Sequence, residues 1–433
     1  MKKPMKILAT CVALAVGGQP ILAAAQPACV TSENVTTIAS NLNNPRGLKF
    51  GPDGSLYVAE GGTGGTQMDP VCDPLQPGPP GPYSGGFDSG IVRIAPNGDI
   101  SVIVSGQPST QNQPGFVSGV ADVAFIGTTL YGLIGGGGCT HGLSGTYNGI
   151  FRVNGNATDK VADLGVYSLN DNVPKPPDYE AEGTWYSMVA VRGDFYAVEP
   201  NHGEIVRVSQ DGTVTRVTGL TAKYGHIVPT AIAYDGNFYV GTLGTFATNF
   251  AAMVIKVTPS GQTSVVVDGL KSVTGIVVDR GSIYILENAG GFVAPCTGTI
   301  LRASRSGRLD PEPVATGLTF ATAMTLGPDG NLYVSDFGYD FGGGAGIGEV
   351  VRVDLHSTQS SVRRDRGAAH AHSDEFLPRP VKGRAETFSN LLQRASLKAL
   401  RSGRCLVPRP VAIVPTCRCF NREVPPRWEP ARG

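Results

Sequence analysis

One hairpin unit recurs six times in this chain of 433 residues, and this repetition restricts the possible folds more than any other feature. Each copy has a short apolar strand, a tight turn and a second strand that contains a tyrosine. Asp-Gly and Arg-Gly pairs supply the positive φ angles that such turns need. A unit this small buries little surface alone, so the copies must pack against one another. The six copies are GLKFGPDGSLYVAE (47–60), ADVAFIGTTLYGLI (121–134), SMVAVRGDFYAVE (187–199), TAIAYDGNFYVGT (230–242), TGIVVDRGSIYILE (274–287) and AMTLGPDGNLYVSD (323–336).

A third strand with one basic residue follows each hairpin, and alternation along the strand places that residue on a solvated face. A fourth strand follows in five copies and is missing after the sixth. A matching segment, VTTIASNL (35–42), instead precedes the first copy. We therefore expect the N-terminal strand to complete the last sheet and close a ring, which removes exposed strand edges. The sequence predicts an all-β fold, a six-bladed β-propeller over residues 26–355. The basic residues are Arg93, Arg152, Arg207, Lys256, Arg302 and Arg352.

Composition and charge agree with this fold and restrict the partners. The chain has 59 Gly and 32 Pro, and charged residues make up 16% of it, which excludes a coiled coil or a long-helix protein. Residues 1–355 hold 20 Lys or Arg and 29 Asp or Glu. This acidic body speaks against binding to nucleic acid or to an anionic membrane. We expect a monomer.

The first 25 residues have the pattern of a secretory signal. Three lysines precede a short apolar run, and Ala23-Ala24-Ala25 offers a cleavage site before Gln26. No later segment has the roughly 18 apolar residues of a membrane span. The sequence therefore predicts a secreted or periplasmic protein with no membrane insertion.

Four cysteines of the body fit that oxidising location. Cys29, Cys72, Cys139 and Cys296 allow up to two disulfides in three possible connectivities. The body has no CxxC and no Cys/His cluster, so zinc ligation by these residues is not expected.

Residues 356–433 lose the repeat altogether. They hold 15 Lys or Arg, 6 Asp or Glu and three cysteines. This composition predicts a disordered basic tail. Two interpretations stay open, a basic arm for an acidic partner and a non-native extension such as a shifted reading frame.

Two stretches carry a family resemblance. NNPRGLKFGPDGSLYVAEGGTGG (43–65) and LGPDGNLYVSDFG (326–338) resemble NHL-type propeller repeats, and the first is similar to the ScyD/ScyE family, named from gene clusters for the pigment scytonemin. The resemblance covers about residues 30–355. It implies an exported propeller with a binding or accessory role, and it carries over no catalytic residue and no pigment synthesis.

The candidate site lies on one face of the ring. In each hairpin the start of the first strand and the end of the tyrosine strand share a face. Four of the six tyrosine strands end in a carboxylate there: Glu60, Glu199, Glu287 and Asp336. With Asn201, His202 and Asn288 these groups suit Ca²⁺ or another divalent cation, or a polar ligand. The alternative is structural, with each acid bonded to loop backbone amides or to Arg46.

Long loops on the same face support a binding role for a small molecule or a protein. Trp185 and Tyr186 precede the first strand of the third copy and project toward this face, where they either stack on a ligand or pack under a loop. Arg46, at the start of the first copy, either pairs with an acid or receives an anion. The long loops are 61–89, 135–148, 243–252, 288–298 and 337–348.

Whether the protein is an enzyme stays open at this point. The alternative to a binding protein is a metal-dependent lactonase of the gluconolactonase (SMP-30) type, in which a divalent ion on the axis polarises a carbonyl. Such proteins start one inner strand with Asn-Gly, whereas the comparable positions here are Arg46-Gly47, Thr274-Gly275 and Thr322-Ala323. Motifs for a nucleophilic serine, a zinc protease, a P-loop or a Rossmann turn are missing.

Overall fold

The computed structural model describes most of the predicted propeller. The predicted signal (1–25) and all but the first residue of the predicted tail (356–433) lie outside the described residues. The described residues are 29–69, 71–72, 81–112, 115–171, 173–176, 178–244, 251–288, 294–339 and 346–356.

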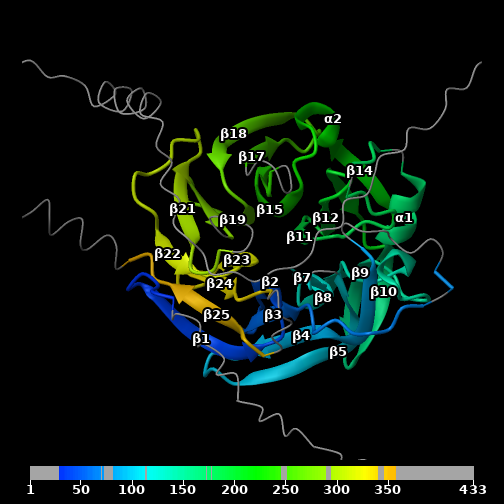
Figure 1. Ribbon diagram of the computed structural model, residues 1–433. Helices are drawn as coiled ribbons and strands as arrows, with labels where there is room; N and C mark the ends of the chain where they lie inside the picture. The colour runs from blue at the N-terminus through cyan, green and yellow to red at the C-terminus, as the bar shows by residue number, and fades with distance from the viewer. Residues whose placement is uncertain are drawn as a thin grey trace, which may run out of the picture. The chain divides into compact units, whose positions relative to one another are not determined.

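Six antiparallel sheets surround a common axis in this part of the chain (Figure 1). The first strand of each hairpin lies innermost, and each inner strand contacts the inner strands of both neighbouring sheets, including the first with the last. The molecule is therefore a six-bladed β-propeller, as the repeats predict.

The blades follow the chain order, with one exception at the ends. Blade 1 contains β2 (Pro45–Phe50), β3 (Leu56–Glu60), β4 (Tyr83–Ile94), β5 (Ile100–Asn112) and β6 (Val117–Ser118); blade 2 contains β7 (Val120–Ile126), β8 (Thr129–Ile134), β9 (Gly149–Asn154) and β10 (Ala157–Asp163). Blade 3 contains β11 (Ser187–Val191), β12 (Asp194–Glu199), β13 (Glu204–Val208) and β14 (Val214–Gly219); blade 4 contains β15 (Pro229–Asp235), β16 (Asn237–Thr242), β17 (Ala252–Val257) and β18 (Thr263–Leu270). Blade 5 contains β19 (Val273–Asp279), β20 (Ser282–Glu287), β21 (Gly298–Ser304) and β22 (Ala315–Leu318); blade 6 contains β23 (Ala323–Leu326), β24 (Leu332–Asp336), β25 (Gly348–Val353) and β1 (Val35–Leu42). The helices are α1 (Leu164–Asn170) and α2 (Thr221–Tyr224), with a 3₁₀ turn at Cys139–His141.

The ring closes through the N-terminal strand. β1 pairs antiparallel with β25, with Val35 opposite Val353 and Leu42 opposite Gly348. Asn34 continues this contact, because its amide donates to the carbonyl of Asp354 at 3.1 Å. The expected closure over residues 35–42 is confirmed.

Two disulfides select one of the three possible connectivities. Cys29 pairs with Cys296, which attaches the chain before β1 to the loop between β20 and β21. Cys72 pairs with Cys139, which joins the loops of blades 1 and 2 on the same face of the ring. Both bridges link segments that the β-ladders leave unpaired.

The repeat tyrosines make contacts both within their own blade and with the next blade. Each tyrosine lies directly opposite the basic residue of its third strand, as in Tyr57 with Arg93 and Tyr196 with Arg207. Several of the rings also meet an aromatic ring of the next blade edge-on, as Tyr131 meets Phe195 at 4.8 Å between ring centroids. Such contacts add to the burial of apolar surface between blades.

Two features differ from the sequence expectation. Part of the predicted loop 61–89 is strand, because β4 begins at Tyr83 and its first residues pair with the end of β5. This extended hairpin pairs its own backbone groups, which makes β4 and β5 longer than the strands of the other blades. The helix α1, between blades 2 and 3, was not expected from the repeat; Asp163 caps it by accepting from the Val166 amide at 3.0 Å.

Candidate functional site

The face at which the inner strands begin, here called the long-loop face, carries the predicted site residues. It also receives the connections between blades, and the longest of these runs from α1 to β11, over residues 171–186. We call it the 171–186 connector. It passes over blades 2 and 3 and delivers charged and aromatic side chains that the repeat does not contain.

The four strand-end carboxylates share one structural task. Each accepts a hydrogen bond from a backbone amide in the connection that precedes its own blade, 15 to 17 residues earlier in the chain. Carboxylates that are engaged in this way hold the connections against the ends of the strands. The bonds are Asn43 N to Glu60 (2.7 Å), Thr184 N to Glu199 (2.8 Å), Lys271 N to Glu287 (2.7 Å) and Thr319 N to Asp336 (2.8 Å).

Burial dominates the electrostatics of these acids. It raises the pKa of Glu199 to about 8 and that of Asp336 to about 7, although backbone amides oppose the shift. It also raises the pKa of Glu60. Glu287 has partners for both oxygens, since the Thr299 hydroxyl donates to the second at 2.9 Å. These contacts match the structural alternative for the four acids.

Arg46 lies beside a hollow at the mouth of the ring. The guanidinium donates to the carbonyl oxygen of Val117, and the Tyr186 hydroxyl lies within its reach. Among the described residues it forms no ion pair with a carboxylate. The hollow is small, with a cavity volume of about 30 Å³, and it opens to solvent; it is lined by Arg46, Ser118, Gly119, Ala121, Gly135, Thr184, Trp185 and Tyr186.

Aromatic side chains stand around this arginine. Burial raises the pKa of the Tyr186 hydroxyl, and the Arg46 charge opposes that rise. Burial raises the pKa of Tyr339, the nearby Tyr186 adds to the rise and the Arg46 charge opposes it; the Tyr339 hydroxyl donates to Asn288 Oδ1 at 2.6 Å. The Asn288 amide in turn donates to the Ala321 carbonyl at 2.7 Å. The structure thus brings Arg46, Tyr186 and Asn288 together, and adds Tyr339, which the sequence did not single out.

The Trp185 side chain lies in the core and not at the surface where a ligand could stack on it. It is fully buried and packs between blades 2 and 3 with Leu164 and Met188. Its ring therefore packs under the connector, and the tryptophan contributes to the hollow only as part of the wall.

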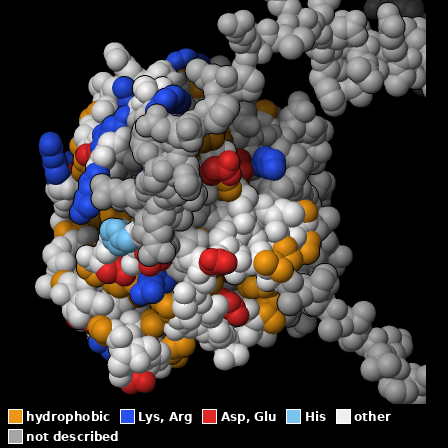
Figure 2. Space-filling model, turned by 90° about the vertical axis from the view of Figure 1, so that its left-hand side faces the viewer, with side chains coloured by type: hydrophobic (Ala, Val, Ile, Leu, Met, Phe, Trp, Pro, Cys, Tyr) orange, Lys and Arg blue, Asp and Glu red, His pale blue; other side chains and the backbone are white. Residues whose placement is uncertain are grey.

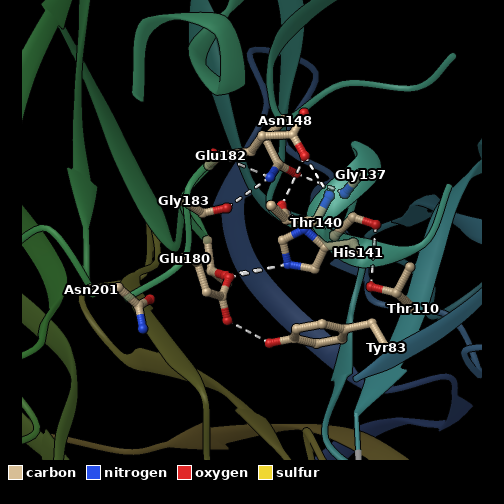
Figure 3. Close-up of polar contacts among 12 residues, drawn as sticks. Tyr83, Thr110, Gly137, Thr140, His141, Asn148, Glu180, Glu182, Gly183 and Asn201 are labelled. Atoms are coloured by element: carbon tan, nitrogen blue, oxygen red, sulfur yellow. Dashed lines mark hydrogen bonds and ion pairs between the residues drawn. The ribbon is translucent and has the colours of Figure 1, made fainter. Parts of the chain in front are cut away.

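A buried polar network fixes the middle of the 171–186 connector (Figure 3). Glu180 is 1% exposed; it accepts from the Tyr83 hydroxyl at 2.6 Å and lies 3.3 Å from His141 Nε2. The Thr184 hydroxyl also donates to it. Burial favours a raised pKa for Glu180, but the bonds from His141, Thr184 and Tyr83 outweigh it and lower the pKa. Tyr83, His141 and Glu180 are enclosed, so the network supports the connector; only Thr184 also reaches the hollow.

Asn201 and His202 contact the same connector from blade 3. The Asn201 amide donates to the Asp178 carbonyl at 2.5 Å, and His202 Nε2 lies 2.7 Å from the Glu180 carbonyl. The His202 amide donates to Glu199. Together with Asp171 and Glu204, His202 forms a group of three potential metal ligands. Burial and the charge of Asp171 raise the pKa of Glu204 to about 7.

Sequence reasoning missed Tyr83, Asp171, Glu180 and Glu204. One signal was present for the last of these: in EPNHGE (199–204) two carboxylates bracket a histidine, and the ladder places Glu199 opposite Glu204. The others lie in non-repeating segments that no period aligns. Their contacts depend on the path of the connector, which the sequence pattern does not give.

Comparisons with known proteins concern the fold. No family model matches the chain, and no curated protein does. Among solved structures, a glucose dehydrogenase-type oxidoreductase from Thermus thermophilus has a TM-score of 0.47 at 16% identity, covering 73% of this chain and 98% of that one. The PQQ-bound aldose sugar dehydrogenase of Streptomyces coelicolor has a TM-score of 0.46 at 16% identity, covering 76% and 100%. A gluconolactonase from Xanthomonas campestris has a TM-score of 0.44 at 11% identity, covering 73% and 89%. These likenesses assign no activity to this chain.

Proposed function

We propose that this chain is an exported propeller of the ScyD/ScyE type that binds a small anionic molecule at the mouth of the ring. The observation that carries the proposal is Arg46, a half-buried guanidinium on the wall of the hollow with no carboxylate partner among the described residues. A partly desolvated cation is costly unless an anion or hydrogen-bond acceptors compensate it.

Arg46 has unused capacity for a ligand. A guanidinium has five N–H donors in a planar fork, which matches the two oxygens of a carboxylate. Its protein partners in the described part are one carbonyl and one phenol hydroxyl. By contrast, Arg93 and Arg207 on the outer strands pair with Asp53 and Asp194 at 2.9 and 2.7 Å. Arg46 lies at the mouth and has no such carboxylate partner among the described residues.

The surroundings of Arg46 favour a planar ligand. Tyr186 and Tyr339 place phenol rings near the guanidinium, and Phe116 and Phe320 contact Tyr339 at centroid distances of 5.3 and 4.8 Å. Tyr186 lines the hollow and the other rings lie behind it, and aromatic rings beside a cation suit a planar anion that can stack at the opening. The ligand class is therefore an aromatic carboxylate.

A metal-dependent lactonase remains the second candidate function, because the six-bladed ring is compatible with an ion on its axis. The strand-end acids that we considered as its ligands already accept backbone amides. An axial ion would have to share those oxygens or use other groups. The two candidates differ in one respect that is easy to measure, since only the lactonase releases acid from a lactone in the presence of a divalent ion.

Fluorescence of Trp185 tests the binding function. Trp185 lines the hollow, and the only other tryptophan, Trp428, is removed as a signal by Trp428→Phe. We expect 4-hydroxybenzoate to change the emission with saturation, and its neutral analogue 4-hydroxybenzamide to bind at least tenfold more weakly. Arg46→Met should remove the difference between the two probes, whereas Arg207→Met should preserve it.

Two results would overturn the binding proposal. One is equal affinity of the wild-type protein for the acid and the amide. The other is hydrolysis of glucono-δ-lactone that needs added Ca²⁺ or Zn²⁺ and persists in Arg46→Met, which would favour the lactonase.

A further inference from the structure

Three side chains of blade 3 and the 171–186 connector present unpartnered acceptor atoms to one another. They are Asp171 at the start of the connector, His202 in the loop after β12, and Glu204 at the start of β13. One ligand atom from each lies within 4.8 Å of those of the other two. Among the residues that the structure describes, Asp171 Oδ2, His202 Nδ1 and Glu204 Oε1 have no hydrogen-bond partner. The side chains of His202 and Glu204 are completely buried, and that of Asp171 is 11% exposed.

The tautomer of His202 follows from its other ring nitrogen. His202 Nε2 lies 2.7 Å from the Glu180 carbonyl oxygen, which can only accept, so Nε2 carries the proton. In the neutral ring Nδ1 then has a lone pair, and it faces Glu204 Oε1 at 3.9 Å. Two acceptors that face each other in a buried site are unfavourable unless a proton or a metal ion lies between them. The Tyr179 ring, stacked on the imidazole at 4.9 Å, fixes its orientation.

Arg216 occupies the opposite side of the two carboxylates. Its Nε donates to Glu204 Oε2 at 2.9 Å, and its terminal nitrogen pairs with Asp171 Oδ1. The arginine therefore holds one oxygen of each carboxylate and leaves the other oxygen directed away from it. With a neutral His202 and both carboxylates ionised, the four groups sum to a net charge of −1, and this form of the cluster attracts a dication.

We propose that Asp171, His202 and Glu204 bind a divalent transition-metal ion of the Zn²⁺ class. One imidazole nitrogen and two carboxylate oxygens suit Zn²⁺ and its neighbours, whereas Ca²⁺ takes oxygen ligands almost exclusively. This site lies on the outer strands of blade 3, is separate from the hollow beside Arg46, and differs from the axial ion considered for the four strand-end acids.

His202 and Glu204 are close to the spacing that an ion between them requires. Nitrogen and oxygen ligands of Zn²⁺ lie at about 2.0–2.1 Å, so a tetrahedral pair is separated by about 3.3 Å. The 3.9 Å gap between His202 and Glu204 would thus close by roughly half an ångström. The hydrogen bond from His202 Nε2 to the Glu180 carbonyl is the outer contact that metal-bound histidines usually have. Three protein ligands leave a fourth position for water.

An ion at this position would join the connector to the propeller. Asp171 precedes the connector segment that Glu180 anchors, while His202 and Glu204 belong to blade 3. Metal binding that requires the folded arrangement stabilises it in proportion to the affinity and the free metal concentration. Zn²⁺ should therefore raise the midpoint of thermal unfolding.

Titration of the full chain with Zn²⁺ and Co²⁺ tests the site. Cys11, Cys405, Cys417 and Cys419 lie outside the described residues, so free thiols are first blocked by alkylation. The protein is treated with a chelator, and binding is followed by calorimetry, by the visible absorption of Co²⁺ and by the unfolding midpoint. We expect His202→Gln and Glu204→Gln each to weaken binding at least tenfold and to remove the rise in midpoint.

His226→Gln is the matched control. His226 lies on the same face and pairs with Asp178 at 2.7 Å, outside the three-residue cluster. It should retain the affinity and the Co²⁺ spectrum of the wild type. The proposal is overturned if the wild-type chain shows no saturable binding, or if binding and spectrum are unchanged in both His202→Gln and Glu204→Gln. A folded His202→Gln protein, verified by circular dichroism, keeps the comparison valid.

Discussion

Replacing Asp336 with asparagine should change how the stability of the propeller depends on pH. Asp336 ends β24 and is 3% exposed, and its Oδ1 accepts the Thr319 amide. Burial raises its pKa from 3.8 to about 7, and the charge of Glu349 adds to the rise. The folded protein therefore retains a proton at this carboxyl that the unfolded chain has already released at neutral pH.

The direction of the effect follows from proton linkage. Below about pH 4 the carboxyl is protonated in both states, so its stabilising contribution is complete. Between about pH 4 and pH 7 only the folded state holds the proton, and the free energy of unfolding falls as the pH rises. At about 1.4 kcal/mol for each pH step, the loss reaches about 4 kcal/mol at pH 7 and then levels off.

Asparagine keeps the side-chain shape and the acceptor for Thr319 but cannot titrate. Urea unfolding of both proteins between about pH 4 and pH 8, with disulfides intact, gives the difference in free energy of unfolding at each pH. We expect the variant to gain about 4 kcal/mol relative to wild type over this interval. Asp53→Asn is the control, because bonds from Ser55 and Arg93 lower the pKa of that exposed carboxyl. A wild-type minus Asp336→Asn difference that is constant with pH would refute the argument.

Three further predictions concern the ring and its export. Gly47→Ala should lower the free energy of unfolding by at least about 2 kcal/mol, because a Cβ there would lie 1.9 Å from Asp122 Oδ1. Gly219 has open space around it, so Gly219→Ala should change the free energy of unfolding by less than about 0.5 kcal/mol. Equal effects of the two substitutions would contradict this prediction. The double substitution Cys29→Ser with Cys296→Ser removes a bridge that closes a 267-residue loop, so it should lower the free energy of unfolding in guanidinium by about 2–5 kcal/mol. An unchanged unfolding midpoint would show that the pairing of β1 alone closes the ring. The chain made with its leader should be recovered outside the cytoplasm with Gln26 as its first residue, and recovery of an intact Met1 would contradict the predicted signal.

The fold was largely predictable because each repeat carries its own register. The turn after the first strand fixes the hairpin, and the tyrosine in the second strand lies opposite the basic residue of the third, as in Tyr284 with Arg302. The last of the six units lacks a fourth strand, and the segment 35–42 is one strand too many at the start of the chain. Placing that segment beside the last unit completes all six sheets. The ladder from Val35 to Val353 shows that placement.

The site was predictable only where it coincides with the repeat. The positions of Glu199 and Asp336 at the ends of their strands follow from the alignment of the copies. Their hydrogen-bond donors do not, because Thr184 and Thr319 lie in connections of unequal length and composition. A carboxylate at the end of a strand is compatible with a metal, a ligand or a backbone amide, and only the path of the connection decides among them.

The connection between blades 2 and 3 departs from the repeat, and both proposed sites lie along it. The side of the ring in Figure 2 shows acidic, basic and apolar side chains interspersed, as expected of a solvated surface. The 171–186 connector, in contrast, carries Asp171 at one end, the enclosed Glu180 in the middle and Tyr186 beside Arg46 at the other. Because Glu180 binds both His141 and, through its carbonyl, His202, the connector is held at a fixed height over both blades. The same connector therefore carries Tyr186 at the mouth and Asp171 at the cluster with His202 and Glu204, so one non-repeating connection contributes to both of the sites that we propose.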